Sequence, residues 1–89
     1  MMPANSVPTR ESLDGYQLLA NAIVADAARD YRRTLRAAKR GDDHFLSHLH
    51  SLKLFFRSSW YRMLTKVDAE YIMNRIEQEV EHEFEMEQQ

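Results

Sequence analysis

The chain has 89 residues, a formal net charge of −2 and no cysteine, which suits one small domain with one modest core. The lack of cysteine excludes disulfides and thiolate metal sites, and two glycines and two prolines leave no Gly-rich phosphate loop. No apolar run reaches the roughly 18 residues of a membrane span, and no signal-peptide pattern opens the sequence. We therefore expect a cytoplasmic protein.

Residues 1–12 are polar and lack periodicity, which predicts a flexible N-terminal arm ahead of one helical domain over residues 13–89. Asp14 has the position of an N-cap, with Gln17 at capping-box spacing. A helix is predicted over about 14–40, ended by Gly41. Its apolar residues recur at steps of three and four, along one face: Tyr16, Leu19, Ala20, Ile23, Val24, Ala27, Tyr31, Leu35 and Ala38.

A second helix is predicted over about 43–64, capped by Asp42 or Asp43. Its run from Leu54 to Leu64 holds two phenylalanines, a tyrosine and the only tryptophan of the chain. Because this aromatic bulk occupies more than one side of the helix, we expect the second helix to lie centrally, with a neighbour on each flank. Its apolar face comprises Phe45, Leu49, Leu52, Phe56, Trp60 and Met63 or Leu64.

A third helix is predicted over about 66–86, with Thr65 and Asp68 as a capping-box-like pair at its start. From Ile76 to Met86, apolar residues and glutamates alternate with a period of two, as in a strand. Glutamate and methionine favour helix, however, and no second strand is available for pairing. The predicted fold is all-α, a three-helix bundle or a helical hairpin with a third helix. The predicted buried residues are Ile23, Leu49, Leu52, Phe56, Ile72 and Ile76.

Two blocks of this sequence resemble a known group of proteins. One runs from Tyr16 to Val24 and continues through Asp30-Tyr31-Arg32. The other comprises residues 55–61, Leu64-Thr65 and residues 68–72. They resemble small uncharacterised all-helical proteins encoded by bacteriophages and integrated mobile elements of Firmicutes-type bacteria. The resemblance implies an accessory protein that acts on host machinery or on element DNA, and it assigns no catalytic residue.

Arg57, Trp60 and Tyr61 form the first candidate binding group. These residue types are enriched at binding hot spots, so an exposed patch would suit a protein partner. Core packing explains them equally well, with the arginine stem lying along the aromatic rings. A domain with this aromatic load can also complete its core by forming a homodimer.

The acidic C-terminal segment is a second candidate for protein binding. Six glutamates and no lysine or arginine lie between Ile76 and Gln89. The segment can simply keep the helix end soluble, dock on a basic protein, or imitate the phosphate spacing of DNA. Glu79, Glu83 and Glu87 are the residues that we single out.

The alternative is a nucleic-acid interface on the first helix. Arginines at steps of three and four make a ridge that could follow a phosphate backbone. A solvated face whose charges pair with Asp26, Asp30 or the third helix explains the ridge as well, and the sequence pI near 6.0 does not favour a general nucleic-acid binder. The basic ridge comprises Arg29, Arg32, Arg33, Arg36, Lys39 and Arg40.

Catalysis and metal binding find little support in the sequence. His44 and His48 share a helix face at i,i+4 spacing, but surface histidines near a helix start are commoner than metal ligands. Ser58 and Ser59 have no base at a fixed spacing. We therefore predict no enzymatic activity, no metal and no cofactor. The expected function is protein binding by a phage or mobile-element accessory protein, in its sharpest form as an inhibitor of a host defence system such as an anti-CRISPR.

Overall fold

The computed structural model describes residues 10–87 and contains only helices and connecting turns within that range. The predicted all-α class is confirmed. The elements are α1 (Arg10–Lys39), the 3-10 helix η2 (Asp43–Phe45), α2 (Leu46–Phe56), α3 (Ser59–Leu64) and α4 (Ala69–Glu87).

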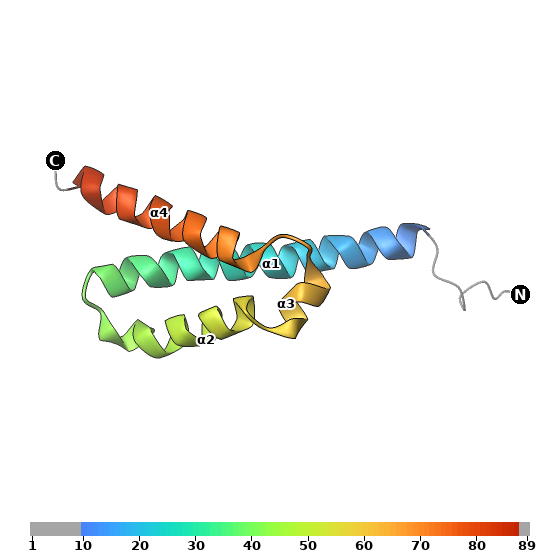
Figure 1. Cartoon of the computed structure of the whole chain (residues 1–89), viewed down its shortest axis with the longest axis horizontal. Helices are drawn as coiled ribbons and strands as arrows, with labels where there is room; N and C mark the ends of the chain where they lie inside the picture. The colour runs from blue at the N-terminus through green and yellow to red at the C-terminus, as the bar shows by residue number, and fades with distance from the viewer. Residues whose placement is uncertain (1–9, 88–89) are drawn as a thin grey trace, which may run out of the picture.

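Helix α1 is the central element, with α2 along one flank, α4 along the other and the short α3 beside its N-terminal half (Figure 1). The expectation that the second helix would be central is wrong. That helix stops at Phe56, whereas the 30-residue α1 is the element that packs against α2, α3 and α4. Ala27 and Ala28 of α1 pack against the core, and their small side chains allow close approach of other elements.

Helix α1 begins earlier than the sequence analysis predicts. Its first residue is Arg10, so residues 10–12 are helical and Asp14 lies inside the helix instead of capping it. No glycine or proline interrupts residues 10–14, and arginine, glutamate and leucine favour helix. Residues 1–9 of the predicted arm lie outside the described residues.

The predicted end of α1 is confirmed. Gly41 has a φ of +89°, the left-handed conformation that glycine adopts at low cost after a helix. The Gly41 amide donates to the Ala38 carbonyl (3.0 Å), and the Asp42 amide donates to the Ala37 carbonyl (3.1 Å). The Asp42 carboxylate then accepts from the His44 amide and caps η2, so the chain reverses direction within four residues.

The predicted helix over 43–64 is broken after Phe56, which corrects its range. Ser58 has extended backbone angles, and its Oγ accepts from the Tyr61 amide (3.1 Å) as the N-cap of α3. The same Oγ donates to the carbonyl of Phe55 at the end of α2 (2.6 Å). Serine competes with helical hydrogen bonds in this way, so one side chain both ends α2 and starts α3.

Helix α4 begins at Ala69, three residues later than predicted. Thr65 is the C-cap of α3, and its hydroxyl accepts from the Val67 amide (3.2 Å), so Thr65 does not cap α4. The Asp68 carbonyl accepts from the Ile72 amide (3.2 Å). Helix α4 continues to Glu87, and the choice of helix over strand for the alternating segment is confirmed.

Helices α1 and α4 run parallel. Arg32 pairs with Glu79, and Arg36, one turn later in α1, pairs with Glu83, one turn later in α4. This direction follows from two reversals, one at Gly41 and one through α3 and the 65–68 turn. Both C-terminal ends therefore lie at the same end of the molecule (Figure 1).

The core lies where all four α-helices meet, and the predicted burial of Leu52, Phe56 and Ile76 is confirmed. The other three predicted residues, Ile23, Leu49 and Ile72, are only partly buried. Leu49 and Ile72 pack against the outside of the buried cluster, and Ile23 lies where α1 meets the short α3. The buried hydrophobic residues of the core are Tyr31, Leu52, Phe56, Tyr61, Met73, Ile76 and Val80.

The molecule is elongated. Its radius of gyration is 17.4 Å, against about 12 Å for a compact domain of this length. The 30 residues of α1 span about 45 Å at a rise of roughly 1.5 Å per residue, more than any neighbouring helix. The N-terminal part of α1 consequently projects beyond α2 and α4 (Figure 1).

Candidate functional site

An apolar groove lies between the N-terminal half of α1 and α3, with a volume of about 530 Å³. The break at Ser58 turns α3 toward α1 and places Trp60 and Met63 beside the helical face that carries Tyr16 and Ile23. We call this surface the α1/α3 groove. It is lined by Tyr16, Gln17, Leu19, Ala20, Ile23, Trp60, Met63 and Leu64.

The α1/α3 groove combines high exposure with a complete lack of charged lining residues. The exposed fractions are 84% for Met63, 72% for Tyr16, 59% for Leu19 and 55% for Trp60. Contiguous exposed apolar residues of this size mark interaction sites in soluble proteins. The apolar stripe of α1 predicts a core face for these residues, because the sequence does not show that the neighbouring helices are too short to cover it.

Trp60 and Tyr61, predicted as one exposed patch, lie in different environments. Trp60 stands at the groove, edge-on to Phe55 with ring centres 5.5 Å apart. Tyr61 is only 1% exposed and donates from its hydroxyl to the Val67 carbonyl (2.9 Å). Burial raises the pKa of Tyr61, and the charge of Asp68 adds to this effect. Tyr61 is therefore a core residue, which corrects its place in the predicted exposed patch.

The basic ridge of α1 is paired with the glutamates of α4. Arg32 Nη2 lies 2.9 Å from Glu79, and Arg36 meets Glu83 through two parallel hydrogen bonds of 2.8 Å, the fork geometry of strong arginine–carboxylate pairs. The hydrogen bond from Arg36 holds the pKa of the Glu83 carboxyl below its ordinary value. The prediction that Arg33, Arg36 and Arg40 lie within reach of Glu77, Glu81 or Glu83 is confirmed for the Arg36–Glu83 pair, whereas the Arg32–Glu79 pair was not predicted.

The remaining residues of the ridge also have partners within the chain. Arg29 pairs with Asp26, and Arg33 pairs with Asp30 at 3.4 Å, each one helical turn away. Lys39 pairs with Glu81. Arg40 lies over the ring of Phe84, 5.7 Å from its centre, a cation–π contact. A phosphate backbone would therefore meet a ridge whose charge is largely balanced.

A buried hydrogen bond reinforces the contact of α1 with α4. The Tyr31 side chain is fully buried, and its hydroxyl donates to Glu77 Oε2 (2.6 Å). Burial is the main cause of a raised pKa of Tyr31, and the hydrogen bond to Glu77 and its negative charge act in the same direction. Tyr31 thus stays protonated and keeps its donor role over the ordinary pH range.

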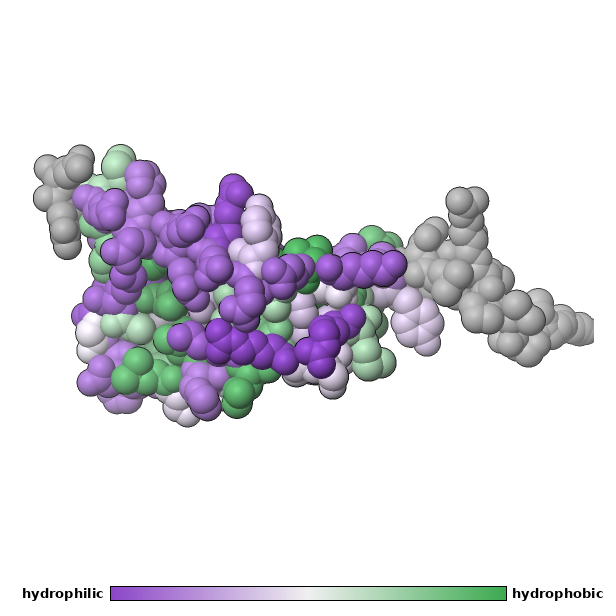
Figure 2. All heavy atoms as spheres, in the orientation of Figure 1, coloured by the Kyte–Doolittle hydropathy of each residue, from purple (hydrophilic) through white to green (hydrophobic). Residues whose placement is uncertain are grey.

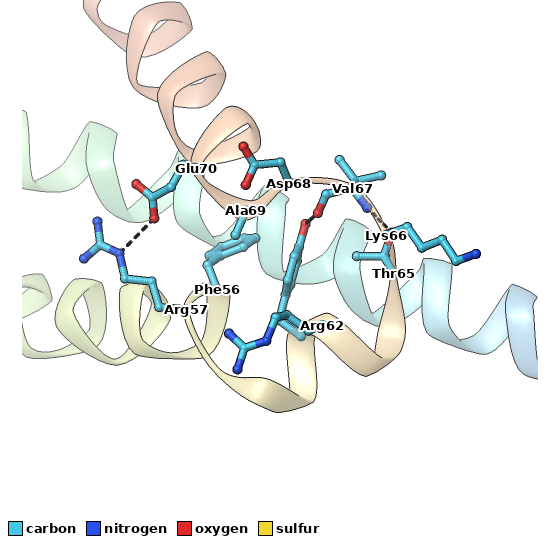
Figure 3. Close-up of a pocket in the computed structure, with 10 residues that line it drawn as sticks. Phe56, Arg57, Arg62, Thr65, Lys66, Val67, Asp68, Ala69 and Glu70 are labelled. Atoms are coloured by element: carbon cyan, nitrogen blue, oxygen red, sulfur yellow. Dashed lines mark hydrogen bonds and ion pairs between the residues drawn. The ribbon is translucent and has the colours of Figure 1, made fainter.

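Arg57 borders a second hollow, of about 580 Å³, at the start of α4 (Figure 3). Its guanidinium donates to Glu70 at 3.0 Å and thereby holds the pKa of the Glu70 carboxyl below its ordinary value. In Figure 3 the Lys66 side chain extends away from this pair. The lining of the hollow includes the acidic Asp68 and Glu70 and the basic Arg57, Arg62 and Lys66, so it carries charges of both signs.

The outward side of α4 carries the unengaged part of the acidic segment. Hydrophilic atoms cover most of α4 on the face in Figure 2, whereas hydrophobic atoms show between them over α2. Glu79 and Glu83 are occupied by arginines, while Glu87 is exposed at the helix end. Of the three glutamates predicted to bind a partner, only Glu87 is thus unconstrained by an ion pair with the described residues.

The two candidate metal ligands, His44 and His48, are drawn to different carboxylates. His44 Nδ1 lies 3.0 Å from Asp42, and His48 Nε2 lies 2.7 Å from Asp30 of α1. Within residues 10–87 no group of three or more histidine, aspartate or glutamate side chains is arranged to hold a metal ion. His48 instead links α2 to α1.

Comparisons with protein-family models, with curated proteins and with solved structures give no match for this chain. Among the described residues, no helix has the length and apolar character needed to cross a bilayer. The α1/α3 groove, with its exposed and uncharged lining, is therefore the strongest candidate site that the fold offers.

Proposed function

We propose that this chain is a small accessory protein of a bacteriophage or mobile element that works by binding a protein through the α1/α3 groove. The supporting observation is the gathering of Tyr16, Leu19, Trp60 and Met63 in one exposed groove that no charged residue lines. The centres of protein interfaces have this composition, with aromatic residues and methionine enriched and charges depleted.

The mobile-element setting rests on the resemblance of the two sequence blocks, which lie within residues 16–80, to phage-encoded helical proteins. Within that setting, the partner is a host protein, and inhibition of a host defence system such as CRISPR is the specific role that we propose. The proposal assigns binding and no catalysis to the chain, and the host cytoplasm is the compartment in which it acts.

The nucleic-acid alternative is weaker on two grounds. All six residues of the basic ridge have a carboxylate or aromatic partner within the chain. Binding to phosphates would therefore break intramolecular ion pairs before gaining new ones. The net charge of −2 adds a long-range repulsion from nucleic acid.

Site-specific photo-crosslinking in host lysate tests the proposal. Benzoylphenylalanine replaces Met63 in the groove or, as a matched control, Leu46, which is 51% exposed at the far end of α2. We expect a crosslinked product with a host protein at position 63 and none at position 46. The product at position 63 should still form after nuclease treatment of the lysate. The absence of any host protein at position 63, or its loss after nuclease treatment or in moderate salt, would contradict the proposal.

A further inference from the structure

The apolar α1/α3 groove is not covered by the described residues of its own chain. We infer that a second copy of this chain covers it, in an antiparallel homodimer in which the N-terminal part of each α1 lies in the groove of the other copy. The inference rests on the proposed function only in using the same binding surface: a second copy covers the groove when no host protein occupies it.

Self-complementarity is the first argument. Tyr16 to Ile23 form the α1 side of the groove. The N-terminal part of α1 that projects beyond α2 and α4 continues directly from this face on the same helix. A two-fold axis across α1 near residue 18 therefore brings each projecting segment onto the groove of the other copy. Such an isologous contact covers both apolar surfaces at once and closes after two copies.

The axis also sets the register of the two helices. With antiparallel helices related about residue 18, Tyr16 of each copy lies opposite Ala20 of the other. The largest side chain of the projecting face thus meets the smallest apolar residue that lines the groove, and facing large and small residues allow helices to approach closely. The lining of the groove itself has no charged side chain that would lose its water on contact.

The available area is the second argument. Aromatic side chains offer about 150–250 Å² each, so the exposed parts of Tyr16, Leu19, Trp60 and Met63 amount to roughly 600 Å² per copy. A standard interface buries about 800 Å² per partner, and the helix backbones at the crossing supply further area. The surface is thus large enough for a weak to moderate dimer, whose population depends on concentration.

The N-terminal part of α1 also has few tertiary contacts within its own chain. Isolated helices shorter than about 12–15 residues are marginal in water, and the part of α1 before Ile23 has little to pack against besides α3. No residue from Gly15 to Ile23 is buried. Packing against a second copy would supply the tertiary contacts that a single chain does not give it.

Sedimentation equilibrium over a wide concentration range, combined with the emission of Trp60, tests the inference on the purified chain. Because Trp60 is the only tryptophan and stands in the groove, its emission reports coverage of this surface directly. We expect the mass to rise toward that of a dimer and the emission maximum to move to shorter wavelength together. A monomer at every concentration overturns the inference.

Charge substitutions localise the interface. Leu19→Glu and Met63→Glu place a carboxylate in the groove at exposed positions, and we expect each to weaken association at least tenfold. Leu46→Glu makes the same change at a similarly exposed leucine at the other end of the molecule and should associate like the parent chain. Circular dichroism checks that all three variants keep their helices. Association that survives both groove substitutions overturns the assignment of this surface.

Disulfide trapping tests the register, and the absence of native cysteine makes it unambiguous. Chains carrying Tyr16→Cys are mixed with chains carrying Ala20→Cys and oxidised. We expect the mixed disulfide to exceed the half share that random pairing gives, because positions 16 and 20 face each other across the two-fold axis. A random or homodisulfide-rich mixture overturns the antiparallel register.

This inference and the proposed function fail separately. A purified chain that stays monomeric, together with a host protein crosslinked at position 63, overturns the homodimer and supports the proposed function. A dimer that behaves as expected, with no host protein at position 63, supports the homodimer and contradicts the proposed role in binding a host protein.

Discussion

In its C-terminal half α1 buries Tyr31 and Thr34 and pairs Arg32 and Arg36 with glutamates of α4, whereas its N-terminal half leaves Tyr16 and Leu19 exposed. The apolar stripe is continuous through both halves. The difference therefore comes from the neighbours: α2 and α4 lie along the C-terminal half, and only the six-residue α3 lies beside the other. An amphipathic helix predicts that something covers its apolar face, but not whether the cover belongs to the same chain.

The charges follow the same division. The C-terminal half of α1 meets the acidic segment in a parallel arrangement that sets arginines against glutamates turn by turn, and this half is internally balanced. The groove of the N-terminal half has no charged lining residue. Binding of a partner to the C-terminal half would require breaking ion pairs. Binding to the N-terminal half requires only the removal of water from apolar surface. This contrast is why we place binding at the groove.

The largest expected effect lies in the core that the C-terminal half helps to form. Phe56 is 1% exposed and its ring centre lies 5.5 Å from those of Tyr31 and Tyr61. Phe56→Ala should lower the free energy of unfolding by about 3–5 kcal/mol, because it leaves a cavity among packed rings. Urea denaturation measures the change. Leu54→Ala, at an exposed position of the same helix, should change stability by about 0.5 kcal/mol or less. Equal effects would contradict the assigned core.

A smaller loss should follow from removing the buried hydroxyl that joins α1 to α4. Tyr31→Phe removes the donor to Glu77, and a hydrogen bond to a charged group contributes about 1.5–3 kcal/mol. Denaturant unfolding of this variant is compared with Tyr71→Phe, which alters an exposed hydroxyl on α4. In a Glu77→Gln background the cost of Tyr31→Phe should shrink, since the acceptor has lost its charge. An undiminished cost would show that the hydroxyl acts independently of Glu77.

Hydrogen exchange should separate the two halves of α1 within one helix. Amides of residues 15–22 have few buried neighbours, while those of residues 31–38 lie against the core. At dilution, where the chain is monomeric, we expect the first set to exchange at least about tenfold faster, a difference of about 1.4 kcal/mol in opening free energy. Equal protection at dilution would contradict the comparison. Protection of residues 15–22 that rises with concentration would support the dimer.

Local chemistry made part of this fold predictable. Gly41 ends α1 because glycine adopts a positive φ at low cost. Asp42 starts η2 because its carboxylate accepts from a free backbone amide. Both effects are local and can be predicted from the residue type. Residue preference predicts helix for the alternating acidic segment, and this prediction is confirmed. The proximity of the helix-one arginines to the glutamates follows from two reversals of direction, which short connections predict.

The parts that were not predictable depend on tertiary competition. A serine such as Ser58 can continue a helix or cap one. Which of the two it does depends on whether burying Tyr61 in the core stabilises the fold more than an unbroken helix would. The same helix break buries Tyr61 in the core and places Trp60 at the surface beside α1. The sequence therefore supplies the residues of the groove without indicating that α3 turns to form it, and the predicted patch joined an exposed residue to a buried one.

The smallest expected effect concerns the ion pairs of the C-terminal half and appears as a pH dependence. Arg36 holds the pKa of the folded Glu83 carboxyl below its ordinary value of 4.5. A carboxyl whose pKa is lower in the folded than in the unfolded chain stabilises the fold above the unfolded pKa, and this stabilisation is lost as pH falls through the lower, folded pKa.

Thermal unfolding of the parent chain and of Glu83→Gln should therefore differ near pH 6 and converge as the pH falls below about 4.5 and through the lowered pKa. The matched control is Glu87→Gln, a change of the same kind one turn further along α4, at a carboxylate without an ion pair to the described residues. This control should follow the parent chain at both pH values. Because the Arg36–Glu83 pair is partly exposed, salt should reduce the difference near pH 6. A difference that persists at low pH would mean that Glu83 stabilises the contact of α1 with α4 through its packing and not through its charge.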